Sequence, residues 1–321
     1  MSEFEKYQAI LERDPHDTQA FVNLCNLAEK EGDYEYLAEL LKYRAQISKQ
    51  IEEIADLYFR AGEIYHDKLG DVTRAAEALL EGFDRDPTHA GIGEKLDQIY
   101  REAGDWDGVV ALSEQRLKAL ETADVNGTKV IIRSDIHQQT GEIFDRALKD
   151  DEQALNHYRK AIELDKSNLV AIFGAREIYY RTGKFKNAAK LCELEARVEK
   201  DENRRIALYR ELAHILLTHL SEPEQAATAL KRALKLNPEN EEVKLDLART
   251  IASCRATEET QKDHRWASEF LLKAARDVAP EETIALAKQA LLAMPESEKA
   301  VEFIEQKSRE LGQIGALTEV Y

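Results

Sequence analysis

The sequence is poor in the residues that build disulfides and metal centres. Only three of its 321 residues are cysteine, and Cys25, Cys192 and Cys254 lie too far apart to form a C-x-x-C pair. A small, odd number of dispersed cysteines indicates a reducing compartment and argues against disulfides or structural zinc. The eight histidines include no H-E-x-x-H sequence, and no D-x-[DN]-x-[DN]-G calcium loop occurs. We therefore expect no metal site.

Long apolar runs and a positive charge balance are also missing. No apolar stretch approaches the roughly 18 residues of a membrane-spanning helix. The first residues, Met1 to Glu5, lack the basic and apolar segments of a signal peptide. The formal net charge is −17, which repels phosphate backbones and anionic lipid. These absences predict a cytoplasmic protein without a nucleic-acid or membrane partner, whose protein or peptide partner carries basic or mixed charge.

Motifs for catalysis and cofactor binding are absent as well. There is no G-x-S-x-G sequence and no glycine-rich phosphate loop. Gly91-Ile92-Gly93 lacks the third glycine and the preceding strand of a dinucleotide-binding turn. His214 and His219 stand five residues apart, which is the wrong spacing for one helical face. We predict no catalytic residues, no cofactor and no enzymatic activity.

What the sequence does contain is helical periodicity between regular breaks. All six prolines fall between apolar periodic segments, where they act as helix stops and starts. Within one such segment, Ala75, Leu79 and Gly82-Phe83 share one helical face. Strand-like alternation is nowhere sustained, because the β-branched run Val130-Ile131-Ile132 leads into another helical pattern. The pattern predicts an all-α fold.

The helical segments repeat. Four of them share apolar or small anchors at offsets of +4, +3 and +5: Ala226, Leu230, Ala233, Pro238; Ala75, Leu79, Gly82, Pro87; Ala154, Tyr158, Ala161, Lys166; and Glu3, Tyr7, Ile10, Pro15. A small residue followed three positions later by a large apolar one precedes three of these segments: Gly62 and Tyr65, Gly141 and Phe144, Ala213 and Leu216. Each unit therefore consists of two helices, the first with the small residue and the second with the apolar stripe.

This pattern resembles the tetratricopeptide repeat (TPR), whose signature is W-x2-L-G-x2-Y, A-x3-F and P. The small residue lets the two helices approach, and the large residue fills the groove beside it. The signature tryptophan is replaced throughout, for example by Tyr58, Gly93 and His137. The resemblance implies a right-handed superhelical solenoid of antiparallel helix pairs.

We expect a repeat array over residues 1–254, with a lone helix at 2–13 and units starting near Thr18, Ala55, Ala90, Ser134, Leu169, Ile206 and Glu241. The turn Asp67–Asp71 and an insertion around Asp124–Gly127 account for the longer units. Residues 255–321 are expected to continue the solenoid as divergent helices at 265–278, 281–294 and 297–311. The chain stops where a further helix opens, without a polar capping helix, which predicts a fragment of a longer array or a docked C-terminal face.

In this family the first helices line a concave groove, and the residue after the small position points into it. The residue one turn earlier on the same helix is expected to contribute as well. The expected groove residues are Asn26, Phe59, Glu63, Glu94, Gln98, Gln138, Glu142, Phe173, Glu177, Arg210, His214 and Arg249. In the first and last units, Val22 and Leu245 lie one turn before Asn26 and Arg249. The groove is predicted to be acidic in its centre, with Phe59 and Phe173 as apolar anchors, and basic in its C-terminal third.

The resemblance also allows one specific test. Family members that hold the C-terminal carboxylate of heat-shock chaperones use a lysine and asparagine clamp. Here Asn26 matches one position, but Val22 and Gly91 occupy others, so the clamp is absent. The sequence therefore favours a non-enzymatic scaffold that binds a peptide segment or partner protein. The alternatives are a regulatory domain of a larger enzyme or signalling protein, an RNA-processing half-repeat protein and an enzyme on a helical toroid. The oligomeric state stays open.

Overall fold

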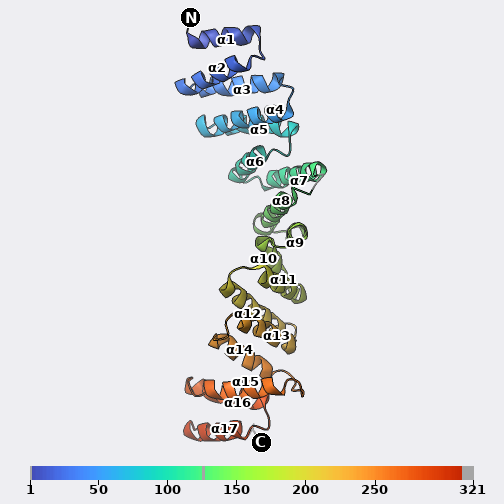
Figure 1. Cartoon of the computed structure of the whole chain (residues 1–321), viewed down its shortest axis with the longest axis vertical. Coiled ribbons are helices and arrows are strands. Elements are labelled where there is room, and N and C mark those ends of the chain that lie inside the picture. The colour runs from blue at the N-terminus through green and yellow to red at the C-terminus, as the bar shows by residue number, and fades with distance from the viewer. Residues whose placement is uncertain (1, 125–126, 313–321) are drawn as a thin grey trace. The chain divides into compact units, whose positions relative to one another are not determined.

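The computed structural model describes residues 2–124 and 127–312, which contain seventeen α-helices, two π-helical turns and no strand (Figure 1). Contacts divide the chain into two compact units, Met1–Asp165 and Lys166–Tyr321. Unit 1 contains α1 Glu3–Arg13, α2 Thr18–Glu31, α3 Tyr34–Ile47, α4 Ile51–Glu63, α5 Val72–Arg85, α6 Ala90–Ala103, α7 Trp106–Ala123, α8 Val130–Ile143 and α9 Asp151–Leu164. Unit 2 contains α10 Leu169–Arg181, α11 Phe185–Val198, α12 Glu202–Thr218, α13 Pro223–Leu236, α14 Glu241–Ala252, α15 Gln261–Ala274, α16 Pro280–Ala293 and α17 Glu298–Glu310. The all-α solenoid prediction is confirmed.

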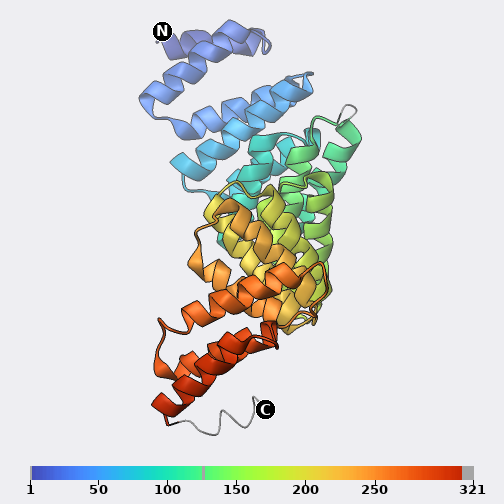
Figure 2. The same ribbon diagram turned by 60° about the horizontal axis from the view of Figure 1, so that its bottom comes forward.

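Within each unit, every helix packs chiefly on the helices directly before and after it in the chain, and the order of the helices can be followed in Figures 1 and 2. Many helices begin at a side-chain cap; Asp17, Asp33 and Asp71, for example, accept hydrogen bonds from backbone N–H groups of the first turn. The prolines also act as punctuation, since Pro223 and Pro280 occupy the first turns of α13 and α16. Caps and prolines therefore fix where the helices start.

The small residues of the repeat are packing sites, as the sequence predicted. A Cβ atom added to Gly62 of α4 would lie 2.6 Å from Cγ of Leu79 on α5. At Gly141 of α8, the added atom would lie 2.8 Å from the ring of Tyr158 on α9. Leu79 and Tyr158 occupy the same position of the second-helix stripe. Each glycine therefore admits the large side chain of its partner helix. Cys25 of α2 and Cys192 of α11 are also buried.

The expected long turn at Asp67–Asp71 is only partly a turn. Residues Ile64–Lys68 form a π-helical turn that continues α4, closed by a hydrogen bond of 3.1 Å from Leu69 N to Ile64 O. The equivalent turn Phe144–Leu148 extends α8. The additional residues are therefore absorbed inside the first helix by wider hydrogen-bonded turns rather than placed in the connection.

The connection between paired helices has one backbone conformation that recurs. Two residues before the second helix, Gly32, Gly70, Gly104 and Gly183 adopt positive φ angles. Lys149 and Ser221 occupy the same position with φ values of 58° and 56°. Glycine adopts this left-handed conformation without steric cost, whereas other residues do not. This spacing of glycines is a repeat signal that the sequence reading missed.

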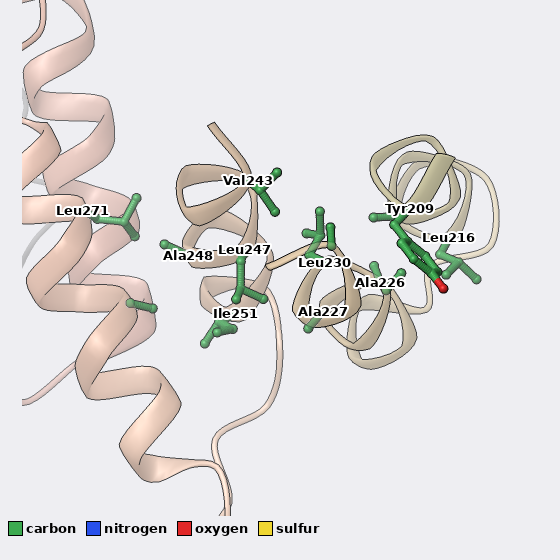
Figure 3. Close-up of a cluster of buried hydrophobic side chains, with 14 of the residues drawn as sticks. Tyr209, Leu216, Ala226, Ala227, Leu230, Val243, Leu247, Ala248, Ile251 and Leu271 are labelled. Atoms are coloured by element: carbon green, nitrogen blue, oxygen red, sulfur yellow. The ribbon is translucent and has the colours of Figure 1, made fainter. Parts of the chain in front are cut away.

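In unit 2, a continuous apolar core runs from α11 to α17. Leu230 of α13 lies between Tyr209 of α12 and the Val243 and Leu247 side chains of α14 (Figure 3). Past Cys254, α15 spans Gln261–Ala274 rather than the expected 265–278, and it packs against α14 and α16. The expected division of the chain after Cys254 stays a prediction. Part of the expected insertion at Asp124–Gly127 lies outside the described residues.

Candidate partner-binding surface

The twelve expected groove residues lie on the first helices of the repeats, ten of them in pairs four residues apart, and none is fully buried. Asn26, Glu94, Gln98, Phe173, Glu177, His214 and Arg249 are exposed, and Phe59, Glu63, Gln138, Glu142 and Arg210 are partly buried. Residues i and i+4 share one side of a helix. Each pair therefore presents one surface of its own helix.

The Phe59 side chain is partly buried and not exposed as the sequence predicted. Its ring lies 5.4 Å from the His89 ring, between centroids. A Cβ atom added to Gly91 of α6 would lie 2.8 Å from Cζ of Phe59. The ring therefore fills the space above a glycine of the neighbouring first helix. The expectation of an exposed aromatic is wrong here, because packing between α4 and α6 already uses the side chain.

Unit 1 accounts for almost all of the net negative charge. Residues 1–165 contain 36 aspartates and glutamates against 20 lysines and arginines, a net charge of −16, whereas residues 166–321 contain 26 and 25, a net charge of −1. Among the described residues, no ion pair engages Glu63 or Glu142. Gln98 donates a hydrogen bond of 2.7 Å to Glu102. The first helices of unit 1 therefore leave carboxylates available to a basic ligand.

In unit 2, three of the expected residues line one cleft of about 940 Å³. Arg210 and His214 come from α12, and Arg249 comes from α14. Pro223 at the start of α13 and Gln289 of α16 complete the wall, and Oε1 of Gln289 is buried without a hydrogen-bond partner. The cleft combines an apolar floor with polar groups around it, as is typical of ligand sites.

The predicted basic character of this region needs correction. The Arg210 guanidinium donates to Asp246 and Glu242, each at 2.8 Å, and the Asp246 carboxylate helps to raise the pKa of Arg210 despite its partial burial. Asp246 and Glu211 also line the cleft. Arg249 forms no ion pair with the described residues. The cleft is therefore of mixed charge, because α14 supplies carboxylates to the arginine of α12.

The two histidines of α12 lie closer together than their spacing indicated. The helix ends at Thr218, so His219 is its C-cap, and its ring lies 6.4 Å from that of His214. His219 stacks on Phe185 at 3.7 Å between centroids and also contacts Tyr180. Since Tyr180 is 37% exposed, this aromatic cluster forms part of the surface where α10, α11 and α12 meet.

Sequence reasoning missed a buried ion network beneath this surface. Arg176 of α10 is 1% exposed and donates to Glu195 of α11 at 2.8 Å and to Glu211 of α12. Its guanidinium lies 5.2 Å from the ring centroid of Phe173. Burial alone would lower the pKa of Arg176, but Glu195 and Glu211 raise it above its ordinary value. Arg176 therefore holds Phe173 and a wall residue of the cleft in place.

Arg176 occupies the slot that holds a small residue in most units. Its partner helix has Cys192 where the units starting near Ala55, Ser134 and Ile206 have leucine or tyrosine, and Glu195 where those three units have alanine or glycine. The large side chain thus comes from the first helix and the small one from the second, and an ion pair replaces the apolar contact between them. A charged residue in a packing slot was the available signal for this network.

The tetratricopeptide repeat model matches residues 55–89 and 135–168. Superkiller protein 3 of Schizosaccharomyces pombe is 24% identical over 148 residues, which cover 46% of this chain and 10% of that protein. TPR repeat-containing protein MJ1428 of Methanocaldococcus jannaschii is 24% identical over 217 residues, which cover 54% of this chain and 37% of that protein. The chain thus spans about a tenth and just over a third of these curated relatives.

Among solved structures, the C-terminal part of a TPR repeat-containing protein from Cytophaga hutchinsonii is 18% identical, with a TM-score of 0.39; the likeness covers 79% of this chain and 99% of that one. The chain is a helical-repeat protein of the tetratricopeptide type. The described residues contain no group of three metal-binding side chains. None of the described helices is long and apolar enough to cross a membrane.

Proposed function

We propose that the protein is a non-enzymatic interaction scaffold that binds a segment of a partner protein along its first helices. The observation that carries this proposal is the 940 Å³ cleft of unit 2, because Arg210, His214 and Arg249 were expected at a binding surface and line it together. Phe173, which is 41% exposed, supplies an aromatic contact on α10. Aromatic and arginine side chains carry much of the binding energy at interfaces.

The charge of unit 1 supports a partner with basic or mixed charge. A net charge of −16 on residues 1–165 attracts a basic segment and orients its approach. In our proposal, the carboxylates of Glu63, Glu94 and Glu142 contribute to this attraction. Within each unit, a preformed helical surface adds many modest contacts without an ordering cost of its own.

Affinity capture from the native lysate tests this proposal. Three baits are compared: the wild-type chain, a cleft variant with His214→Glu and Arg249→Glu, and a control with Lys273→Glu and Lys299→Glu. The control substitutes exposed lysines of α15 and α17. We expect the wild type and the control to retain the same partner and the cleft variant to lose it. Partners retained equally by all three folded baits would refute binding at this cleft.

A further inference from the structure

A second hollow of unit 2 lies away from the cleft described above. It has a volume of about 400 Å³ and is formed by the second helices α11 and α13, with α12 as its floor. We define it as the α11–α13 trough, lined by Lys186, Lys190, Arg232, Leu212, Leu216 and Leu220. At 100° per residue, Leu212 and Leu216 lie on a different side of α12 from Arg210 and His214. The trough and the cleft are therefore separate surfaces.

The rim of the trough carries surplus positive charge. Lys186 and Lys190 are exposed one turn apart on α11, and neither forms an ion pair with the described residues. On the opposite rim, Arg232 of α13 donates to Glu193 at 2.7 Å.

Glu193 also accepts from Arg197 at 2.7 Å, and these two arginines lower its pKa. One carboxylate thus serves two guanidinium groups. Glu222, at the start of α13, is the other acid on the trough. Together, α11 and α13 carry more surface cations than anions, because the remaining acid of α11, Glu195, is buried against Arg176.

The floor between these cations is apolar. Leu212 and Leu216 are 6% and 5% exposed, and Leu220 is half-buried at the end of the hollow. Small side chains of α11 and α13, Ala189 and Ala229, keep the floor open. Such a floor receives aliphatic or aromatic side chains. A phosphate backbone has no comparable groups to bury there, and the net charge of −17 disfavours nucleic acid further.

We infer that the α11–α13 trough is a second docking surface, and that it takes an acidic amphipathic segment of a partner protein. Apolar side chains of that segment fill the floor over Leu216 and Leu220. Its carboxylates pair with Lys186 and Lys190 on one rim and with Arg232 on the other. The inference rests on charge complementarity and the apolar floor of the trough, and it does not depend on the cleft of α12 and α14.

Peptide-display selection tests the inference without a known ligand. A random 16-residue library is selected on the full-length wild-type chain and counter-selected on the Lys186→Glu, Lys190→Glu variant. We expect peptides that bind only the wild type to carry net negative charge and apolar residues three or four positions apart. The selected peptides are then measured by fluorescence anisotropy against Leu220→Ser and against the matched charge control Lys273→Glu, Lys299→Glu.

We expect at least tenfold weaker binding to the Lys186→Glu, Lys190→Glu variant, weaker binding to Leu220→Ser, and affinity within twofold of the wild type for the control. An empty pool, a pool without net negative charge, or equal loss in the control overturns the inference. Binding of a 15-nucleotide oligouridine through the same lysines, with no effect of Leu220→Ser, overturns the inference in favour of nucleic acid. Selected sequences that match the acidic helices of unit 1 while the chain dimerises identify a second copy as the occupant instead.

Discussion

The substitution Gly62→Ala tests the repeat architecture at its closest helix contact. The added Cβ atom would lie 2.6 Å from Cγ, 2.7 Å from Cδ2 and 3.3 Å from Cδ1 of Leu79, which is fully buried. Cγ is the branch point of the leucine side chain, so rotating the terminal methyl groups does not relieve the contact; either Leu79 leaves its χ1 rotamer or α4 and α5 move apart. Overpacking of this kind costs about 1–3 kcal/mol.

Helix propensity opposes this cost, since alanine favours a helix interior over glycine by about 0.8–1.0 kcal/mol. We therefore expect Gly62→Ala to destabilise the protein by roughly 1 kcal/mol, within a range of about 0–2 kcal/mol. In a Leu79→Ala background the clash is gone, and the same substitution should stabilise by about 1 kcal/mol. The difference is a coupling energy of about 2 kcal/mol between the two positions.

Amide hydrogen exchange of α4 and α5 peptides, followed by mass spectrometry, reports the local stability of this helix pair in the full chain. Ala111→Gly on an exposed position of α7 measures the propensity effect without a packing change. Gly62→Ala that stabilises the wild type, or has the same effect in both backgrounds, would refute the argument. The same experiment can be repeated with Gly141→Ala and Tyr158→Ala, because the Cβ atom added to Gly141 would lie 2.8 Å from the Tyr158 ring.

Three further predictions follow from single contacts. His137 and His157 are buried with their Nδ1 atoms 3.2 Å apart, and burial lowers both pKa values to about 4. Their neutral pairing therefore stabilises the fold fully above about pH 6.5, and this stabilisation is lost as the pH falls toward 4. Urea unfolding should show a free energy of unfolding roughly 1–3 kcal/mol lower at pH 5 than at pH 7.5. The His157→Gln variant should show a smaller loss. Lys149 has a left-handed backbone conformation with φ of 58°, and Lys149→Gly removes its steric cost. The substitution should stabilise the α8–α9 pair by roughly 0.5–1 kcal/mol, measured by hydrogen exchange of these helices. Unchanged exchange would contradict this cost. For a captured partner, Phe173→Ala should accelerate dissociation in surface plasmon resonance without loss of fold, whereas Phe59→Ala should lower the melting temperature, and a reversed pattern would contradict their different burial.

Much of the fold could be predicted from the sequence because repeat packing is local. Gly62, Gly141 and the stripe residues Leu79 and Tyr158 recur at fixed offsets, and each helix packs on its neighbour. The π-helical turns could not be predicted, since additional residues fit equally well in a turn or inside a helix. The recurrent left-handed glycines were visible in the sequence but fell outside the anchor positions on which the repeats were aligned.

The candidate surface was harder to predict, because exposure depends on the neighbouring helix. Phe59 is partly buried since α6 has Gly91 beneath it, whereas Phe173 stays exposed above Arg176. Arg210 is positive in the sequence, but Asp246 on the next first helix neutralises it. Such contacts lie one repeat away in the chain, and no spacing within a single helix indicates them.

Site-specific photo-crosslinking tests the central claim most directly. A photo-reactive amino acid replaces Thr218 or Ser253, two exposed residues that line the cleft of unit 2, or the exposed control residue Lys299 of α17. We predict that the same partner crosslinks from the two cleft positions in native lysate and not from the control. Crosslinks to a specific partner from Lys299, with none from Thr218 or Ser253, would contradict the account.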